Sequence, residues 1–197
     1  MKTNKIIMLI TFLILISLNL KCEDNKYDIY SKGINFILHK DKSIFDSTYL
    51  KNLCISEFNT FGGDVMADLQ QEHYKKIFKF SKNLAYRFKS NTILETRIVD
   101  SLKLDFPYTF LQEEEVWEHF SIESNKHKTY DSLSDYYKNG GLINLSEIIY
   151  NKRRNKAAYF IFILSATSSG GSIYLVFSEK NNNIWYTKKG ELIGWIH

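Results

Sequence analysis

The chain has 197 residues, of which 44% are hydrophobic and 15% aromatic, with two cysteines and one proline. This composition excludes a disordered chain, a collagen-like chain and a disulfide-rich scaffold, and it fits one ordinary globular domain. The net charge of +4 arises from 26 Lys and Arg against 22 Asp and Glu, and Lys2, Lys5 and Lys21 all precede the first acidic residue. Because the rest of the chain is close to neutral, its charge predicts no binding of nucleic acid.

Residues 1–21 have the three-part form of a secretory signal peptide. Two lysines stand near the start, an apolar run extends from Ile6 to Leu18, and polar residues follow it. The run is shorter than the ~20 apolar residues that a membrane-spanning helix needs, so a retained anchor is the less favoured alternative. We predict that residues 1–21 are removed and that the protein is exported to the periplasm, the outer membrane or the medium.

Cys22 has several alternative fates. The residues before it resemble a bacterial lipobox, in which the cysteine becomes the lipidated first residue, although Lys21 stands where a small residue is usual. The alternative is ordinary cleavage next to Cys22. If its thiol survives in an oxidising compartment, a disulfide with Cys54 can form. Otherwise Cys54 is a small buried apolar side chain, since the sequence offers it no activating neighbour for catalysis.

The first half of the mature chain has the periodicity of helices. Tyr27 to Leu38 places apolar residues at i, i+4, i+7 and i+8, which predicts a helix with one apolar face. After an ambiguous stretch from Ile44 to Phe58, Asp64 is expected to cap a second helix that carries His73 on its apolar face.

The middle of the chain is harder to assign. Periodicity is weak from Asn83 to Phe110, and Pro107 indicates an extended or turning stretch. Short helices are predicted over Gln112–Phe120 and Tyr130–Lys138, the second ending at the Asn-Gly-Gly that follows it.

The last third predicts an antiparallel meander of about four strands. The expected strands are Leu142–Tyr150, Ala157–Ser165, Ser172–Ser178, and Ile184–Thr187 with Leu192–Ile196. A break of the last strand at Gly190 is left open. Tyr159 to Leu164 is apolar on both sides, so this strand is expected to be central and covered on both faces. Asn181 to Asn183 is expected to form a turn. N-terminal helices packed on a C-terminal meander define an α+β class, in a single domain over residues 22–197.

Several short segments of the second half occur in a characteristic order. They are Trp117 with Phe120, Gly141–Ser146, Lys156–Tyr159, Leu175–Asn181, Trp185 and Gly194–Ile196. Together they resemble a widespread, uncharacterised family of small exported bacterial proteins, whose members often carry Cys near the glycine loop and Ser at the end, where this chain has Ser165–Ser169 and His197. The resemblance implies an exported α+β module with no known reaction.

One group of side chains has the composition of an acid–base or metal site. On a helix, Glu115 and His119 share a face, and Asp135 is a further candidate acid–base residue. A metal site needs three or four convergent ligands, and acidic residues are favoured at helix N-termini in any case. We therefore predict a solvated helix start, with no metal and no cofactor. The glycine-rich loop Thr167–Ser172 joins two predicted strands, so it is expected to be a hairpin and not a phosphate loop.

The aromatic residues of the meander offer a second kind of site. Tyr174, Trp185 and Tyr186 are candidates for an aromatic surface that binds a protein, a glycan or an apolar ligand. Trp117 and Trp195 are expected to be buried and structural. Because no motif of a known catalytic class occurs, the favoured function is a non-catalytic binding module that meets an unknown partner in the cell envelope and touches the membrane only through a lipid on Cys22.

Two alternatives to this binding module stay open. One is a small enzyme with a pocket between helices and sheet, in which His119 or Asp135 acts as the acid–base residue. The other is an immunity or inhibitor-type protein.

Overall fold

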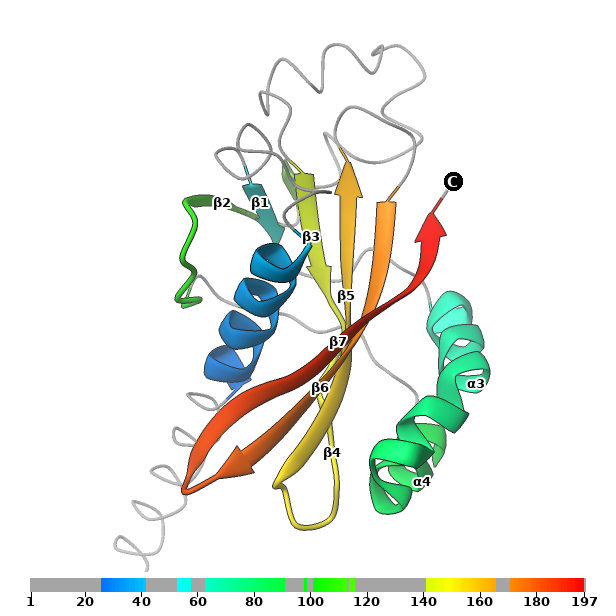
Figure 1. Ribbon diagram of the computed structural model, residues 1–197. Helices are drawn as coiled ribbons and strands as arrows, with labels where there is room; N and C mark the ends of the chain where they lie inside the picture. Colours follow the sequence, from blue (N-terminus) through cyan, green and yellow to red (C-terminus); the bar gives the residue numbers. More distant parts are fainter. Residues whose placement is uncertain are drawn as a thin grey trace, which may run out of the picture.

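The computed structural model describes residues 26–41, 53–57, 63–90, 98, 101–112, 114–115, 141–165 and 171–196. These residues form helices and a mixed seven-stranded sheet (Figure 1), so the predicted combination of α and β structure is confirmed. The predicted signal peptide, Cys22, the predicted helix over 130–138 and most of the predicted helix over 112–120, with Trp117, lie outside the described residues.

The described elements have the following bounds. The helices are residues 26–40, α3 (Gly63–Phe80) and α4 (Lys82–Ser90). The strands are β1 (Leu53–Ser56), β2 (Tyr108–Leu111), β3 (Gly141–Leu145), β4 (Ile149–Tyr150), β5 (Lys156–Ser165), β6 (Gly171–Asn181) and β7 (Ile184–Ile196). The sheet order is β2-β1-β3-β5-β6-β7, and β4 pairs with β5.

The central strand β5 is buried on both faces, as its apolar sequence predicts. Tyr159 and Ile161 pack in one apolar cluster with the 26–40 helix, whereas Phe160 and Phe162 pack in a second cluster with α3 and α4. Figure 1 shows the 26–40 helix and the α3–α4 pair on opposite sides of the strands. This alternation follows from the two-residue period of a strand, which sends successive side chains to opposite faces.

The 26–40 helix meets the sheet through the apolar face that its spacing predicts. Tyr30, Ile34, Ile37 and Leu38 are each at most 1% exposed. The hydroxyl of Tyr30 donates to the carbonyl of Ser146 at 2.7 Å, which satisfies the one polar atom of this face. Burial of these side chains supplies most of the helix's stability, since isolated helices of this length are marginal in water.

A polar stripe on the same helix holds a second segment of chain. Ser31, Asn35 and His39 recur every four residues, so they lie along one side of the helix. Ser31 Oγ accepts from the amide of Lys103 at 2.8 Å, and Asn35 Oδ1 accepts from the amide of Asp105 at 3.0 Å. His39 Nε2 lies 2.7 Å from Asp105 Oδ2. The stripe therefore fixes the segment that leads into β2.

Two strands occur where the sequence was ambiguous or weakly periodic. β1 pairs in parallel with β2 and with β3, so the sheet is mixed and larger than the predicted four-stranded antiparallel meander. β1 has four residues, all of them buried. A buried run this short shows no alternation of polar and apolar residues, so periodicity alone cannot identify it as a strand. The sequence does not predict the helix α4 for a similar reason. Its nine residues place only one turn of buried side chains, around Leu84 and Phe88, which is too short to establish a helical period.

The predicted strand from Leu142 to Tyr150 is divided into β3 and β4, and Ser146 accounts for the break. Its amide still donates to the carbonyl of Phe160 at 3.1 Å. Its own carbonyl, however, accepts from Tyr30, and its hydroxyl oxygen takes the amide of Phe160 at 2.8 Å. A side chain thus replaces the backbone in the ladder at this point, which a sequence pattern does not indicate.

The sequence leaves open whether the last strand is broken at Gly190, and in the structure β7 is continuous through it. The register between β6 and β7 shifts on either side, between Phe177 and Ser178 and between Ile173 and Tyr174. A Cβ atom on Gly190 would lie 3.1 Å from Cγ1 of Ile37, so the glycine makes room for the 26–40 helix. Asn182 and Asn183 have φ angles of 48° and 63°, which gives the predicted turn the geometry of a two-residue hairpin.

Candidate functional site

Of the three candidate acid–base residues, only Glu115 lies within the described residues. Glu115 is exposed, and its carboxylate accepts from the amide of Gln112 at 2.9 Å, as expected at the start of a helix. His119 and Asp135 lie outside the described residues. Within the described ranges no group of three His, Cys, Asp or Glu side chains is placed to hold a metal ion.

Cys54 lies in β1 with 2% of its surface exposed. Burial, with a smaller contribution from the charge of Glu115, raises the pKa of its thiol to about 12. The thiolate, which is the nucleophilic form, is therefore scarce at physiological pH. These properties fit the predicted small apolar side chain and oppose a catalytic role.

The predicted aromatic surface is wrong in two of its three residues. Tyr174 is 0% exposed and Trp185 is 2% exposed, so both belong to the core beneath the 26–40 helix. Tyr186 is 48% exposed, as predicted. Conversely Trp195, which was expected to be structural, is 56% exposed. Alternation along β7 decides which residues face inward, and the two register shifts change that alternation in ways that the sequence does not reveal.

The exposed apolar side chains of the described residues are concentrated on one strand. Four of the five exposed large hydrophobic residues lie on β7, and the fifth, Tyr86, lies on α4. The four are Ile184, Tyr186, Leu192 and Trp195. β7 is also the last strand in the sheet order, and among the described strands it pairs only with β6. An edge strand has a partner strand on one side only, so among the described strands this edge combines apolar side chains with backbone hydrogen-bonding capacity.

Lysines occupy the middle of the same strand. The side chains of Lys188 and Lys189 are 56% and 63% exposed. Lys40, from the end of the 26–40 helix, donates to the carbonyl of Gly190 at 2.8 Å. The ammonium group of Lys32 lies 5.8 Å from the ring centre of Tyr186. The strand therefore has an apolar pair near each end and positive charge between them.

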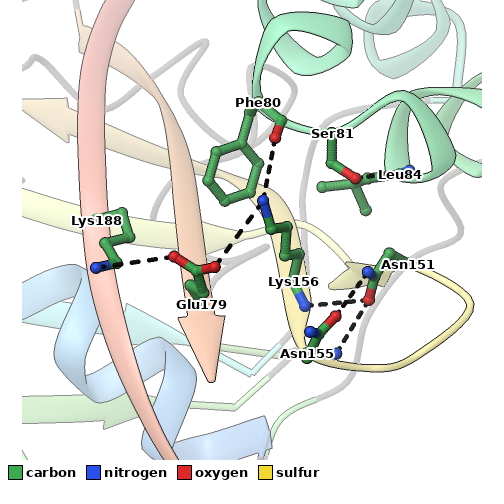
Figure 2. Close-up of polar contacts among 8 residues, drawn as sticks. All are labelled: Phe80, Ser81, Leu84, Asn151, Asn155, Lys156, Glu179 and Lys188. Carbon is green, nitrogen blue, oxygen red and sulfur yellow. Dashed lines mark hydrogen bonds and ion pairs between the residues drawn. The ribbon is translucent and has the colours of Figure 1, made fainter. Parts of the chain in front are cut away.

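Glu179 and Glu191 balance only part of this charge. Glu179 lies 3.7 Å from Lys188 and 3.9 Å from Lys156, and Lys156 also donates to the carbonyl of Phe80 at the end of α3 (Figure 2). Glu191 is shared in the same way between Lys189 and Lys76, the latter at 3.3 Å. Each carboxylate thus meets two ammonium groups, which leaves an excess of positive charge along this surface.

The second shared carboxylate has a perturbed pKa. Partial burial would raise the pKa of Glu191, but the hydrogen bonds and charges of Lys189 and Lys76 outweigh it, so the pKa is lowered. His73 lies nearby on α3 with 5% of its surface exposed. Burial lowers its pKa, and Lys76 adds to this effect against the opposing charges of Glu72 and Glu191. This cluster joins α3 to β7.

Comparison of the chain with protein-family models, with curated proteins and with solved structures found no match. None of the described helices is long and apolar enough to cross a membrane. Of the four exposed apolar residues of β7, the sequence predicts only Tyr186 as part of a binding surface, because strand order cannot be deduced from a local pattern.

Proposed function

We propose that the protein is an exported, non-catalytic binding module of the cell envelope, and that it binds its partner along β7. One observation carries the proposal. Four of the five exposed large hydrophobic side chains of the described residues lie on a single edge strand. Soluble proteins expose scattered apolar residues routinely, but their concentration on the last of the described strands favours a site of association.

Export is supported by the form of residues 1–21, and it remains a prediction from the sequence. The resemblance to small exported bacterial proteins also favours export, and it too is argued from the sequence alone. Mass spectrometry of the protein from its native cells tests the proposal. A mature chain that begins near Cys22, with or without the added mass of a lipid, is expected. Recovery of the full-length chain in the cytoplasmic fraction would reject export.

Site-specific photocrosslinking tests the binding surface. A photoreactive phenylalanine analogue is placed at Tyr186, at Trp195 or at Tyr86, which is 63% exposed on α4 and serves as the control. We expect the two β7 positions to form the same crosslinked product in intact cells and Tyr86 to form none. Equal products from all three positions, or none from β7, would reject β7 as the binding surface.

A further inference from the structure

The arrangement of charge and apolar side chains on β7 indicates what kind of partner fits it. We propose that β7 binds an extended segment of another protein, with acidic side chains at its centre and aromatic or aliphatic side chains toward its ends. This inference rests on the proposed binding function and adds the chemistry of the partner.

The extended form of the partner follows from the position of β7. An edge strand binds an incoming strand through main-chain hydrogen bonds, and its side chains select the sequence. β7 has 13 residues, and among the described strands only β6 pairs with it, although the carbonyl of Gly190 at its middle already accepts from Lys40. A partner that bound the apolar side chains alone would leave this backbone capacity unused.

The acidic centre follows from the lysines. Lys188 and Lys189 are both more than half exposed, and each shares its carboxylate with a second lysine. A carboxylate on an opposing strand would lie beside these two ammonium groups, and opposite charges across a strand pair are favourable. The apolar pairs, Ile184 with Tyr186 and Leu192 with Trp195, flank the lysines and would receive apolar side chains from the partner.

The same lysines argue against a second copy of this chain as the partner. Two β7 strands could pair antiparallel so that Ile184 and Tyr186 of one copy lie near Leu192 and Trp195 of the other. The two-fold axis of this pairing would lie near Lys189. Lys189 of one copy would then lie directly opposite Lys189 of the other, with Lys188 opposite Gly190 and one position from the axis. Like charges directly opposite each other destabilise a strand pair, and edge lysines commonly prevent such self-association.

Selection from a library tests the proposal without knowledge of the natural partner. Random peptides as long as β7 are displayed and selected against the intact mature protein, and against the double variant Lys188→Glu/Lys189→Glu. The matched control is Lys75→Glu/Lys79→Glu, which makes the same change in net charge at exposed positions of α3. Melting temperatures and sedimentation are measured for every variant. Lys188→Gln/Lys189→Gln replaces the charge-reversed variant if that variant does not fold.

We expect the wild type and the α3 control to enrich peptides with Asp or Glu at the centre and apolar residues on both sides. The affinity of these peptides, measured by fluorescence anisotropy, should fall at least tenfold in the β7 variant and should fall with added salt. The charge-reversed variant should select basic centres instead.

Three results would overturn the proposal. In the first, the enriched peptides bind the β7 variant and the α3 control with equal affinity. In the second, the selection enriches no peptide. In the third, sedimentation reveals a dimer of the wild type that the β7 substitutions dissociate. If one of these results is obtained while Tyr186 and Trp195 still crosslink to a partner, the proposed binding function is retained. Only the proposal that the partner is an acidic extended segment is then rejected.

Discussion

A Cβ atom on Gly33 would lie 1.8 Å from the hydroxyl oxygen of Tyr159. That hydroxyl donates to the carbonyl of Ile29 at 2.9 Å, one helical turn before the glycine. The absence of a side chain at Gly33 therefore allows a strand tyrosine to reach the backbone of the 26–40 helix. This contact joins the helix to the central strand β5, and it sets how closely the helix approaches the sheet.

Gly33→Ala should lower the free energy of unfolding by ~1–3 kcal/mol, the usual cost of overpacking a core. Alanine favours a helix over glycine by up to about 1 kcal/mol, so the steric cost has to exceed this gain. Denaturant unfolding of Gly33→Ala, Tyr159→Phe and the double variant measures the coupling between the two positions. The double variant should lose less stability than the sum of the single losses, because Phe removes the atom closest to the added methyl group. Additive losses would contradict the contact.

Trp185 and Trp195 should differ sharply in their effect on stability. Trp185 is 2% exposed and packs against Tyr150 with ring centres 5.8 Å apart, whereas Trp195 is 56% exposed. Trp185→Ala should cost ~3–5 kcal/mol, as for other buried aromatic residues. Trp195→Ala should stay within about 0.5 kcal/mol of wild type. Equal losses in denaturant unfolding would show that Trp195 is buried, and the proposed edge site would lose one of its residues.

Local sequence patterns predicted the parts of the fold that they determine directly. The apolar spacing of the 26–40 helix and the continuous apolar run of β5 both appear as buried faces in the structure. Patterns could not predict how strands are ordered. The short amphipathic context of Trp195 predicts burial, yet it is 56% exposed, whereas Trp185 on the same edge strand is 2% exposed. Which residues of β7 face inward depends on its register with β6, which shifts twice. The candidate site is therefore a property of topology more than of any motif.

Cys54 should react with thiol reagents only when the protein opens. Burial raises the pKa of its thiol to about 12, so near pH 8 the reactive thiolate is rare, and 2% exposure restricts access. In a Cys22→Ser background, labelling by iodoacetamide should be slow in the native state and rapid in denaturant. Native labelling as fast as that of the unfolded chain would contradict the burial of β1.

The stability of the protein should decrease as the pH falls below about 6.5, because His73 is held in its neutral form. Burial, together with Lys76, lowers the pKa of His73 from 6.5 in the folded state. The pKa of His73 in the unfolded chain is 6.5. At a pH between 6.5 and the lower pKa of the folded state, His73 is protonated in the unfolded chain and neutral in the folded protein. Stability then falls with decreasing pH by at most ~1.4 kcal/mol per pH unit, and it levels off below the folded pKa.

His73→Leu should reduce this dependence, and urea unfolding from pH 7.5 to pH 5 measures it. Glu191 contributes in a lower window, since its own pKa is lowered from 4.5. Its stabilising effect is present above pH 4.5 and is lost as the pH falls through the folded value. A slope between pH 6.5 and pH 5 that is unchanged in His73→Leu would assign the effect to another group.

The turn between β4 and β5 should depend on the side chain of Asn151 more than on that of its neighbour Asn155. Asn151 Oδ1 accepts from the amides of Asn155 and Lys156 at 3.0 and 3.1 Å, and its Nδ2 donates to Asn155 Oδ1 at 2.8 Å (Figure 2). Asn151→Ala deprives two backbone amides of their acceptor and should cost ~2–3 kcal/mol. Asn155→Ala removes one side-chain bond and leaves its carbonyl bonded to the amide of Lys180 at 2.8 Å, so it should cost ~1 kcal/mol. Thermal unfolding of both variants decides the order. Lys156 directly follows Asn155 and forms an ion pair with Glu179. If Asn155→Ala lowers the stability as much as Asn151→Ala does, the turn is fixed by this ion pair and not by the carboxamide of Asn151.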